Sequence, residues 1–278
     1  AGTPLIEMVT EPTIHSSEEA FALVSEVRKL VRYLGICDGN MEEGSLRADV
    51  NVSIRPVGTT TLGTKVEIKN MNSLRNIQRA IEHEIIRQTK VLNEGGTLIQ
   101  ETRTFDAHTG TTHSMRVKET MNDYRYFPEP DLSPLEITED WLAEIRAKMP
   151  LLPWQQEKKL MDEYNLPAYD AHFLSESREM AMYFQSVFEH ANYAKQISNW
   201  LMGPVKSHLN EHNLSIDQFV LSPQNLAEVI NLVEKGIISH NLAVQQLFPL
   251  CIENPKRSPS EIVAEHKWSQ EQSGDELK

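Results

Sequence analysis

Residues 41–55 read MEEGSLRADVNVSIR, and this stretch decides how the chain folds. Four apolar side chains, Ala48, Val50, Val52 and Ile54, alternate with polar ones along it. Alternation with a period of two places the apolar set on one face of a β-strand and the polar set on the other. The stretch therefore predicts a strand that packs one face against a core and presents a polar face on its other side.

A second strand is predicted at residues 65–70, KVEIKN, after a loop from Pro56 to Gly63. Val66 and Ile68 supply its apolar face. If the two strands pair, their apolar sides share one core and their polar sides form a second surface. We call this surface the charged face; its residues are Arg47, Asp49, Asn51, Arg55, Lys65, Glu67 and Lys69. Most polar strand faces simply meet water, so the spacing alone leaves both a solvated and a functional charged face open.

The amino-acid composition limits the class of protein that this sequence can form. The chain has 278 residues, of which 40% are hydrophobic and 24% charged, as is typical of a globular protein with one or two domains. No apolar run reaches the roughly 18 residues of a membrane span, and the first residues do not resemble a signal peptide, so we expect a cytoplasmic protein without membrane attachment. Cys37 and Cys251 support neither a disulfide framework nor a zinc site. The net charge of -13 argues against a surface that is basic throughout, although it allows a local basic stripe.

Helices are predicted on both sides of the first two strands. Residues 16–34 begin with Ser-Ser-Glu-Glu, a capping pattern, and carry apolar residues at helical spacing up to Gly35. A second helix begins at Asn72 or Ser73 and ends at Gly95. Its predicted buried stripe consists of Leu74, Ile77, Ile81, Ile85 and Leu92. Off this stripe, arginines and glutamates are interpreted as a solvated helix face: Arg75, Arg79, Arg87, Glu82, Glu84 and Glu94.

Two further strands are predicted at residues 98–105 and 111–117, joined by a turn at Thr109-Gly110. His108 and His113 flank this turn without a third ligand nearby, so we do not interpret them as metal ligands. Residues 122–132, NDYRYFPEPDL, then place three aromatic residues and an arginine around two prolines. Such a segment is a shaped loop, and its composition fits a structural aromatic cluster as well as the wall of a ligand site.

From residue 138 onward, strand alternation gives way to amphipathic helices separated by prolines. Helices are predicted at residues 139–148, 154–164, 177–190, 193–210, 223–235, 239–247 and 260–266. Their apolar stripes are typical of a bundle core rather than of a cofactor site. The sequence has no GxxxxGK[ST], GxGxxG, HExxH or GxSxG motif, so nucleotide binding would have to use an unusual fold. The residues alone therefore indicate an α+β protein with an appended all-α domain.

Several longer blocks of the sequence are more specific than these short motifs. In the first half they are MEEGSLRxDxN at 41–51, GTKVEIKNMNS at 63–73, QETR at 100–103, MRxKE at 115–119 and DYRYFPEPD at 123–131. In the helical half they are LPAYDA at 166–171 and NWLMG at 199–203. Together these blocks closely resemble the GatB family, the B-type subunits of the aspartyl/glutamyl-tRNA amidotransferases.

The resemblance implies a fold and its limits. It implies a partial glutamine-synthetase-like cradle with a mainly antiparallel sheet at residues 1–137. An all-α domain of the GatB/YqeY type would follow at residues 138–268, and the start of a linker to a tail domain at residues 269–278. Family members begin earlier, with a strand that should contribute metal ligands, so the resemblance also implies that the chain is a fragment and an incomplete catalyst by itself.

The resemblance implies an activity as well. It is ATP-dependent phosphorylation of the side-chain carboxylate of Glu-tRNA(Gln) or Asp-tRNA(Asn), followed by amidation with ammonia from glutamine. The implied partners are the misacylated tRNA, the glutaminase subunit of the complex and its small subunit, and the implied cofactors are ATP and Mg²⁺. Two other functions stay open: a non-catalytic tRNA-binding or assembly module of the same complex, and a free-standing amide ligase that acts without tRNA on a small molecule.

The site residues follow from the resemblance and from the chemistry that the charged face could perform. Phosphoryl transfer between two anions needs Mg²⁺ and cationic side chains to offset negative charge in the transition state. We therefore expect Glu7 and Glu43 to bind the metal. The expected catalytic residues are Glu42, Arg47, Lys69 and Arg125, and those expected to bind the cofactor are Arg47, Asp49, Lys65, Glu67, Asn70, Arg116 and Asp123.

Overall fold

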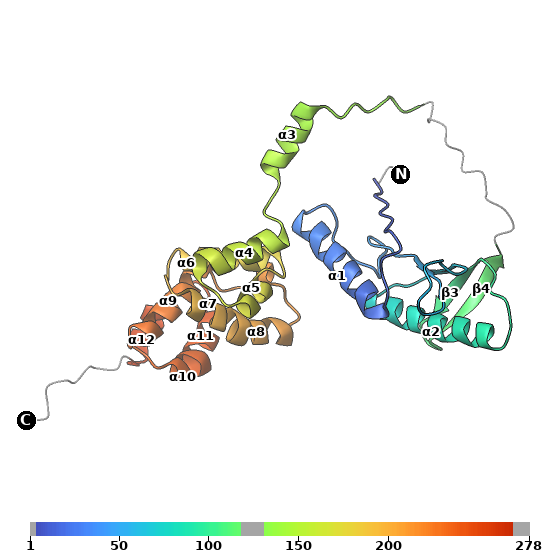
Figure 1. The fold of residues 1–278 in the computed structure, drawn as a ribbon. Helices are drawn as coiled ribbons and strands as arrows, with labels where there is room; N and C mark the ends of the chain where they lie inside the picture. Colours follow the sequence, from blue (N-terminus) through green and yellow to red (C-terminus); the bar gives the residue numbers. More distant parts are fainter. Residues whose placement is uncertain (1–3, 118–130, 269–278) are drawn as a thin grey trace, which may run out of the picture. The chain divides into compact units, whose positions relative to one another are not determined.

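The computed structural model describes residues 4–117 and 131–268, with residues 116 and 117 described by their backbone alone. The chain divides into two compact units, residues 1–149 and 150–278, and each is described by itself. Strands occur in the described part of the first unit, and the described part of the second is built from helices (Figure 1). The α+β class predicted from the sequence is therefore confirmed.

A four-stranded sheet in the order β1-β2-β3-β4 forms the centre of the first unit, within residues 4–117. The strands are β1 (Val50–Val52), β2 (Val66–Lys69), β3 (Glu101–Asp106) and β4 (Thr111–Val117). β1 pairs antiparallel with β2, which confirms the predicted hairpin, and β3 pairs antiparallel with β4. β2 and β3 run parallel, because the chain crosses between them through a helix, as a parallel pair requires. The sheet is thus mixed, with two of its three pairings antiparallel, in agreement with the predicted mainly antiparallel sheet.

Two helices supply the core of this unit. α1 (Ser17–Tyr33) begins at Ser16, whose hydroxyl accepts a hydrogen bond from the backbone N–H of Glu19. α2 (Leu74–Asn93) begins in the same way at Ser73. α1 and α2 pack against each other (Figure 1). Ile68 and Phe105 of the sheet share one apolar cluster with residues of both helices. By alternation, the charged face is the opposite side of the sheet.

The buried stripe of α2 differs from the predicted one. Ile85 and Leu92 were expected inside, but they are 38% and 43% exposed. Glu84 and Gln88 are fully buried in their place. At about 100° per residue, the observed stripe is rotated by roughly 50° about the helix axis from the predicted one. The prediction was wrong because it counted only apolar residues, whereas Arg103 on β3 gives Glu84 a charged partner inside.

The described part of the second unit, residues 150–268, is all-α, as predicted. Its α-helices are α4 (Pro153–Tyr164), α5 (Ala168–Leu174), α6 (Arg178–Phe188), α7 (Ala194–Trp200), α8 (Lys206–Glu211), α9 (Pro223–Glu234), α10 (His240–Leu242), α11 (Phe248–Glu253) and α12 (Pro259–Glu265). A 3-10 turn, η2, spans Ile216–Gln218. Phe184 and Ile230 are among the fully buried residues of its core. None of the helices in the described ranges has both the length and the apolar character to cross a membrane.

Two features of this unit were not predicted. The helix expected at residues 193–210 is divided by a π-helical turn, η1 (Leu201–Val205), and a second π-helical turn, η3 (Ala243–Leu247), precedes α11. η1 contains Pro204, whose ring lacks a backbone N–H and clashes with the preceding turn, and a π-bulge accommodates such a residue. The short α5, seven residues long, was missed because it is too brief to show a helical period.

The observed units and the predicted domains assign one helix differently. α3 (Glu139–Lys148) belongs to the first unit by its contacts, whereas the sequence-based limit at residues 137 and 138 places it in the second domain. It has no buried residue, so packing does not tie it firmly to either unit. The limits at 137 and 138 stay a prediction, and the segment 269–278 lies outside the described residues.

Candidate functional site

Four residues on the charged side of the sheet form a connected row. Lys69 Nζ contacts the carboxylate of Asp49 and lies 3.4 Å from Glu67 Oε1. Thr102, which was not predicted as a site residue, donates its hydroxyl hydrogen to Glu67 Oε2 at 2.7 Å. Asp49 precedes β1, Lys69 and Glu67 belong to β2, and Thr102 belongs to β3. We call these four residues the polar row.

The polar row holds one cation between two anions. The hydrogen bond with Asp49 raises the pKa of Lys69; burial opposes this effect, and the negative charges of Asp49 and Glu67 add to it. Lys69 is therefore an ammonium ion at neutral pH. Its side chain is 36% exposed, so a ligand can reach it while both carboxylates hold it in place. An ammonium ion in this setting can bind a phosphate or carboxylate oxygen.

Three predicted residues lie in the turn before β1. Glu42 and Glu43 are exposed, and their backbone N–H groups donate to the side chain of Asn40 at 3.0 and 3.3 Å. Arg47 is also exposed, and its Nε donates to the carbonyl oxygen of Gly44 at 3.2 Å. Within the described residues, no hydrogen bond or ion pair joins these side chains to the polar row. Their assignment to the site stays a prediction.

Asn70 has a visible structural role at the end of β2. Its φ of 69° lies in the left-handed region, which asparagine tolerates better than most residues. Its side-chain amide donates to the carbonyl oxygen of Phe105 on β3 at 3.3 Å. The geometry thus shows Asn70 closing the parallel strand pair, and cofactor binding by this residue stays a prediction.

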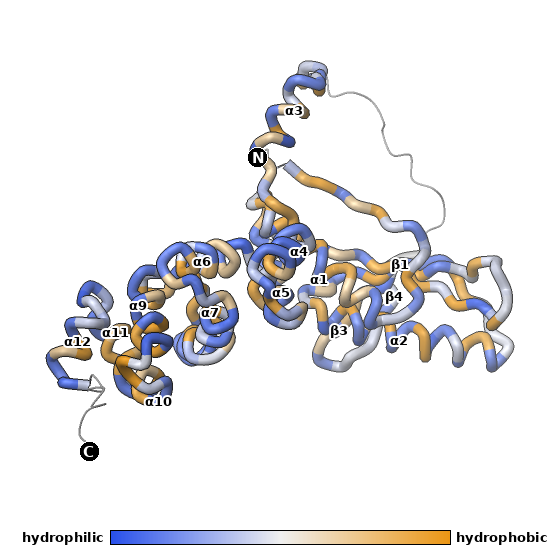
Figure 2. Tube along the Cα trace, turned by 60° about the vertical axis from the view of Figure 1, so that its left-hand side comes forward, coloured by the Kyte–Doolittle hydropathy of each residue, from blue (hydrophilic) through white to orange (hydrophobic). Residues whose placement is uncertain are grey.

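Glu7 and Lys65 are both exposed and lie outside the polar row. Glu7 belongs to an extended N-terminal segment that contains several apolar residues (Figure 2). Among them, Leu5 and Val9 are 90% and 85% exposed. No group of three or more His, Cys, Asp or Glu side chains that could hold a metal occurs in the described parts of the chain. Magnesium, however, is commonly held by one or two carboxylates together with water and substrate phosphates. The two carboxylates of the polar row fit that requirement.

The remaining predicted residues cannot be placed by their side chains. Asp123 and Arg125 lie outside the described residues, and so does the side chain of Arg116. The backbone of Arg116 lies opposite Thr102 in the register of β3 and β4. This register puts the Arg116 position beside the β3 end of the polar row.

A buried cluster of charged residues lies on the other side of the sheet, facing α2. We call it the ionic cluster; it consists of Glu84, Arg87, Gln88, Glu101, Arg103 and Thr112. Arg87 donates two hydrogen bonds of 2.9 Å to Glu84, and Arg103 Nη1 lies 2.7 Å from Glu101 Oε1. The interpretation of Glu84 and Arg87 as part of a solvated face was therefore wrong, because both pair with charged residues between the helix and the sheet.

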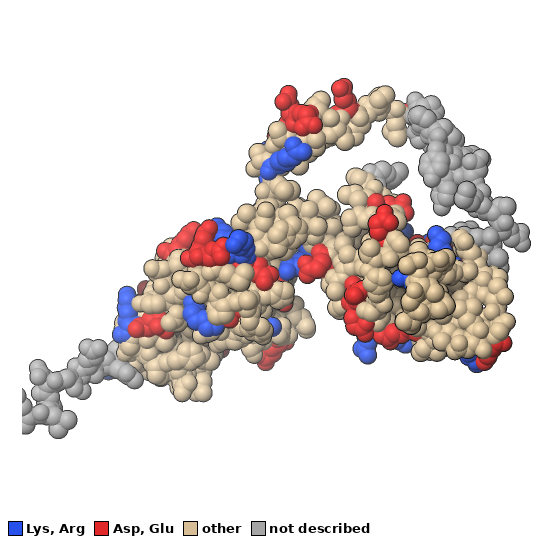
Figure 3. All heavy atoms as spheres, viewed as in Figure 1, with Lys and Arg blue, Asp and Glu red and all other residues tan. Residues whose placement is uncertain are grey.

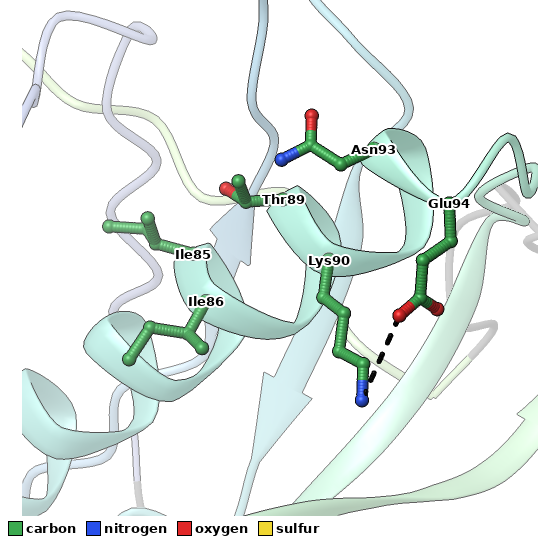
Figure 4. Close-up of a pocket in the computed structure, with 6 residues that line it drawn as sticks. All are labelled: Ile85, Ile86, Thr89, Lys90, Asn93 and Glu94. Atoms are coloured by element: carbon green, nitrogen blue, oxygen red, sulfur yellow. Dashed lines mark ion pairs between the residues drawn. The ribbon is translucent and has the colours of Figure 1, made fainter.

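A hollow on α2 carries none of this chemistry. It is lined by Ile85, Ile86, Thr89, Lys90, Asn93 and Glu94 (Figure 4). Its charged pair, Lys90 and Glu94, is 4.0 Å apart and more than half exposed. α2 covers the core side of the sheet, so this hollow and the charged face lie on opposite sides of the layer. The polar row remains the stronger site candidate.

On the side drawn in Figure 3, the surface charge of the described residues does not mark a nucleic-acid site. Basic side chains lie scattered among acidic ones there in each unit. The net charge of -13 agrees with that distribution. Attraction of a polyanion over a wide surface normally requires a basic patch. The candidate site is thus defined by local geometry on the sheet.

Comparison with known proteins agrees with the class that the sequence blocks suggested. The GatB/GatE catalytic domain family matches residues 1–143, and the GatB domain family matches residues 182–278. These matches define a component of the amidotransferase class that carries a catalytic domain and a helical domain. The chain belongs to the GatB family.

Three similar proteins are each named as the B subunit of an aspartyl/glutamyl-tRNA(Asn/Gln) amidotransferase. The protein of Geobacter sp. (strain M21) is 48% identical over 266 residues, which cover 95% of this chain and 55% of the relative. The Thermosynechococcus vestitus protein is 47% identical over 270 residues, covering 97% and 54%. The Macrococcus caseolyticus protein is 45% identical over 277 residues, covering 100% and 58%. The chain therefore spans about half the length of the relatives it matches.

Proposed function

We propose that this chain carries part of the site at which an amidotransferase activates a tRNA-bound carboxylate. In this reaction, ATP phosphorylates the side chain of Glu-tRNA(Gln) or Asp-tRNA(Asn), and ammonia from glutamine then displaces the phosphate. A carboxylate is a poor acyl donor until phosphorylation provides a leaving group. The observation that carries the proposal is the exposed ammonium of Lys69, held between Asp49 and Glu67 in a chain of the GatB family.

The residues divide this work by their chemistry. Lys69 contacts the transferred phosphoryl group or the carboxylate that receives it, and so offsets their negative charge. Asp49 and Glu67 hold Lys69 in place from two sides. Bound Mg²⁺ would supply further positive charge next to the phosphates. Glu7 and Glu43 are proposed to hold this ion with phosphate and water, and the carboxylates of the polar row fit it as well.

The other predicted residues would act around the polar row. Arg47 and Arg125 are proposed to contact phosphate or carboxylate oxygens, for which the guanidinium fork is suited. Glu42 is proposed to act beside Arg47 in the same turn. Lys65, Asn70, Arg116 and Asp123 are proposed to bind ATP.

The partners are those that the reaction requires. Ammonia would come from the glutaminase subunit, with the small subunit in the same heterotrimer, and the misacylated tRNA would present the carboxylate. The relatives bear names that refer to aspartyl and glutamyl tRNA, which supports this substrate class. We propose that the complex works in the cytoplasm.

The test replaces Lys69 by methionine, which keeps most of the side-chain volume and removes the charge. The native protein is assembled with the glutaminase and small subunits, then assayed for amidation of Glu-tRNA(Gln) and of Asp-tRNA(Asn). We expect amidation to fall by about 100-fold or more, with tRNA binding retained, because a cation at the reacting phosphate acts mainly in the transition state.

The matched control is Lys90→Met. Lys90 is an exposed lysine of α2 on the far side of the sheet layer, and its replacement is expected to leave amidation unchanged. Amidation by Lys69→Met at the level of this control would contradict the proposal. That result would favour the non-catalytic tRNA-binding or assembly module instead.

A further inference from the structure

The two carboxylate oxygens of Glu67 have different partners. Oε2 accepts a hydrogen bond of 2.7 Å from the hydroxyl of Thr102, and Oε1 lies 3.4 Å from Lys69 Nζ. A hydrogen bond to one oxygen restrains the rotation of a carboxylate about its last bond. The hydroxyl of Thr102 therefore helps to orient the second oxygen of Glu67 toward Lys69.

The burial of these residues increases along the polar row. The side chains of Lys69 and Glu67 are 36% and 18% exposed, whereas Thr102 is 2% exposed. A ligand on the charged face can thus reach Lys69, but it has almost no access to Thr102. The hydrogen bond to Glu67 gives Thr102 an indirect route to a bound substrate.

Thr102 is held firmly from two directions. Its partner in the parallel pairing of β2 and β3 is Glu67 itself, so the backbone register places the two side chains next to each other. Its neighbours on β3, Glu101 and Arg103, point to the opposite face and belong to the ionic cluster, where Arg103 Nε lies 3.3 Å from Glu84 Oε1. A β-branched side chain on such a strand has few rotamers available.

We propose that Thr102 is a positioning residue of the activation site: its buried hydroxyl orients Glu67, and Glu67 in turn places the ammonium of Lys69 for the phosphoryl group. This inference rests on the proposed function, in which Lys69 contacts the reacting groups. The hydroxyl donates to a carboxylate, and hydrogen bonds to charged groups are stronger than those between neutral groups. Loss of this donor removes a restraint on Glu67 and so weakens the placement of Lys69.

The test compares two substitutions that differ in the hydroxyl. Thr102→Val keeps the shape of the side chain and removes the donor, whereas Thr102→Ser keeps the donor. In the native complex with the glutaminase and small subunits, we expect Thr102→Val to lower kcat for amidation by about 10- to 100-fold, with KM for the tRNA changed by less than about twofold. Thr102→Ser is expected to retain kcat within about threefold of wild type, because the donor remains.

Thr104→Val is the matched control. Thr104 lies two residues further along β3 on the same side of the sheet, opposite Lys69 in register, and its hydroxyl has no hydrogen bond to any residue in the described ranges. We expect its replacement to leave kcat unchanged. If Thr102→Val does not fold, Thr102→Ala removes the same hydroxyl without adding a methyl group and takes its place.

Three results would overturn the proposal. They are a kcat of Thr102→Val equal to wild type, a Thr102→Ser variant as impaired as Thr102→Val, and a Thr104→Val variant as impaired as Thr102→Val. Parallel measurement of Lys69→Met separates this inference from the proposed function. If Lys69→Met is active, the proposed function fails; if Lys69→Met is inactive while Thr102→Val is fully active, only the positioning role fails.

Discussion

Replacement of Glu84 by glutamine tests the packing between α2 and the sheet. The substitution removes a negative charge from a side chain that is fully buried and keeps its shape. Arg87 donates two hydrogen bonds of 2.9 Å to this carboxylate, and Arg103 Nε lies 3.3 Å from it. Thr112 and Gln88 also donate to it. The variant therefore removes one of the two anions that Arg87 and Arg103 share and leaves them Glu101.

The expected loss of stability can be estimated from these contacts. Removing one partner of a buried ion pair typically costs about 3–5 kcal/mol, because the other charge stays buried without compensation. Glu101 remains paired with both arginines, and the side chains of Arg87 and Arg103 keep 22% and 13% of their surface exposed, so this carboxylate and water recover part of that cost. A glutamine oxygen can also still accept one hydrogen bond. We therefore expect Glu84→Gln to lower the free energy of unfolding of the first unit by about 2–4 kcal/mol.

The four tryptophans of the chain lie outside the sheet, so tryptophan fluorescence does not report on it directly; they are Trp141, Trp154, Trp200 and Trp268. Hydrogen exchange of the amides in α2 and β3 is therefore the appropriate measurement. A loss of about 2–4 kcal/mol corresponds to protection factors lower by about 30- to 1000-fold. Glu94→Gln is the matched control on the same helix, since that side chain is 66% exposed and lies 4.0 Å from Lys90. Exposed pairs of this kind contribute less than about 1 kcal/mol.

The loss of stability caused by Glu84→Gln should become smaller as the pH falls. Burial raises the pKa of Glu84, but hydrogen bonds from Arg87, Thr112 and Gln88 and the charge of Arg87 outweigh it, so the pKa lies below its usual value of 4.5. A carboxyl group with a lowered pKa stabilises the folded state fully above the unfolded-state pKa, and this contribution is lost as the pH falls through the folded-state pKa. The difference in the free energy of unfolding between wild type and Glu84→Gln should therefore become smaller below pH 4.5. Equal protection in Glu84→Gln and Glu94→Gln, or a difference that persists at low pH, would refute this reasoning.

Two further predictions concern the second unit. Asp170 is 3% exposed and accepts a hydrogen bond of 2.6 Å from Lys195, so Asp170→Asn should lower the free energy of unfolding of this unit by about 1–3 kcal/mol; an unchanged thermal unfolding transition would contradict this expectation. Burial raises the pKa of the Cys251 thiol to about 12, and the charge of Glu228 adds to this effect. Cys251 should therefore resist iodoacetamide at pH 8, whereas the part-exposed Cys37 should react. Peptide mass spectrometry measures both sites, and equal labelling would show that burial does not protect Cys251.

Local patterns predicted those parts of the fold that depend on neighbouring residues. The alternation of Val50 and Val52 with polar residues, and the same alternation at Val66 and Ile68, gave the β1 and β2 hairpin with its shared apolar face. Serine caps and apolar spacing located the helices in the same way. α2 separates β2 from β3 in the sequence, so their parallel pairing joins residues that are far apart along the chain. No local pattern predicts such a contact.

The candidate site shows the same division. The strand pattern predicted that Asp49, Glu67 and Lys69 share one face, and the structure brings them together, whereas their roles in a site stay a prediction. Thr102 was missed because its place beside Glu67 requires the parallel pairing. Glu84 was misassigned because a charged residue is buried only where it has a partner. Its partner Arg103 lies on β3, which follows α2 in the sequence, so the sequence of the helix alone does not reveal the pair.

β3 connects these two findings. It is an interior strand of the sheet, yet its sequence ETRTFD carries polar residues on both faces, and Phe105 is its one apolar side chain. Glu101 and Arg103 on one face bind the ionic cluster, and Thr102 on the other binds Glu67. Because one short backbone segment carries both sets of contacts, a change that loosens the pairing with Glu84 also loosens the strand that holds Thr102. We therefore expect the buried charges behind the sheet to help define the geometry of the charged face, a role that would account for polar residues on a strand whose position otherwise favours apolar ones.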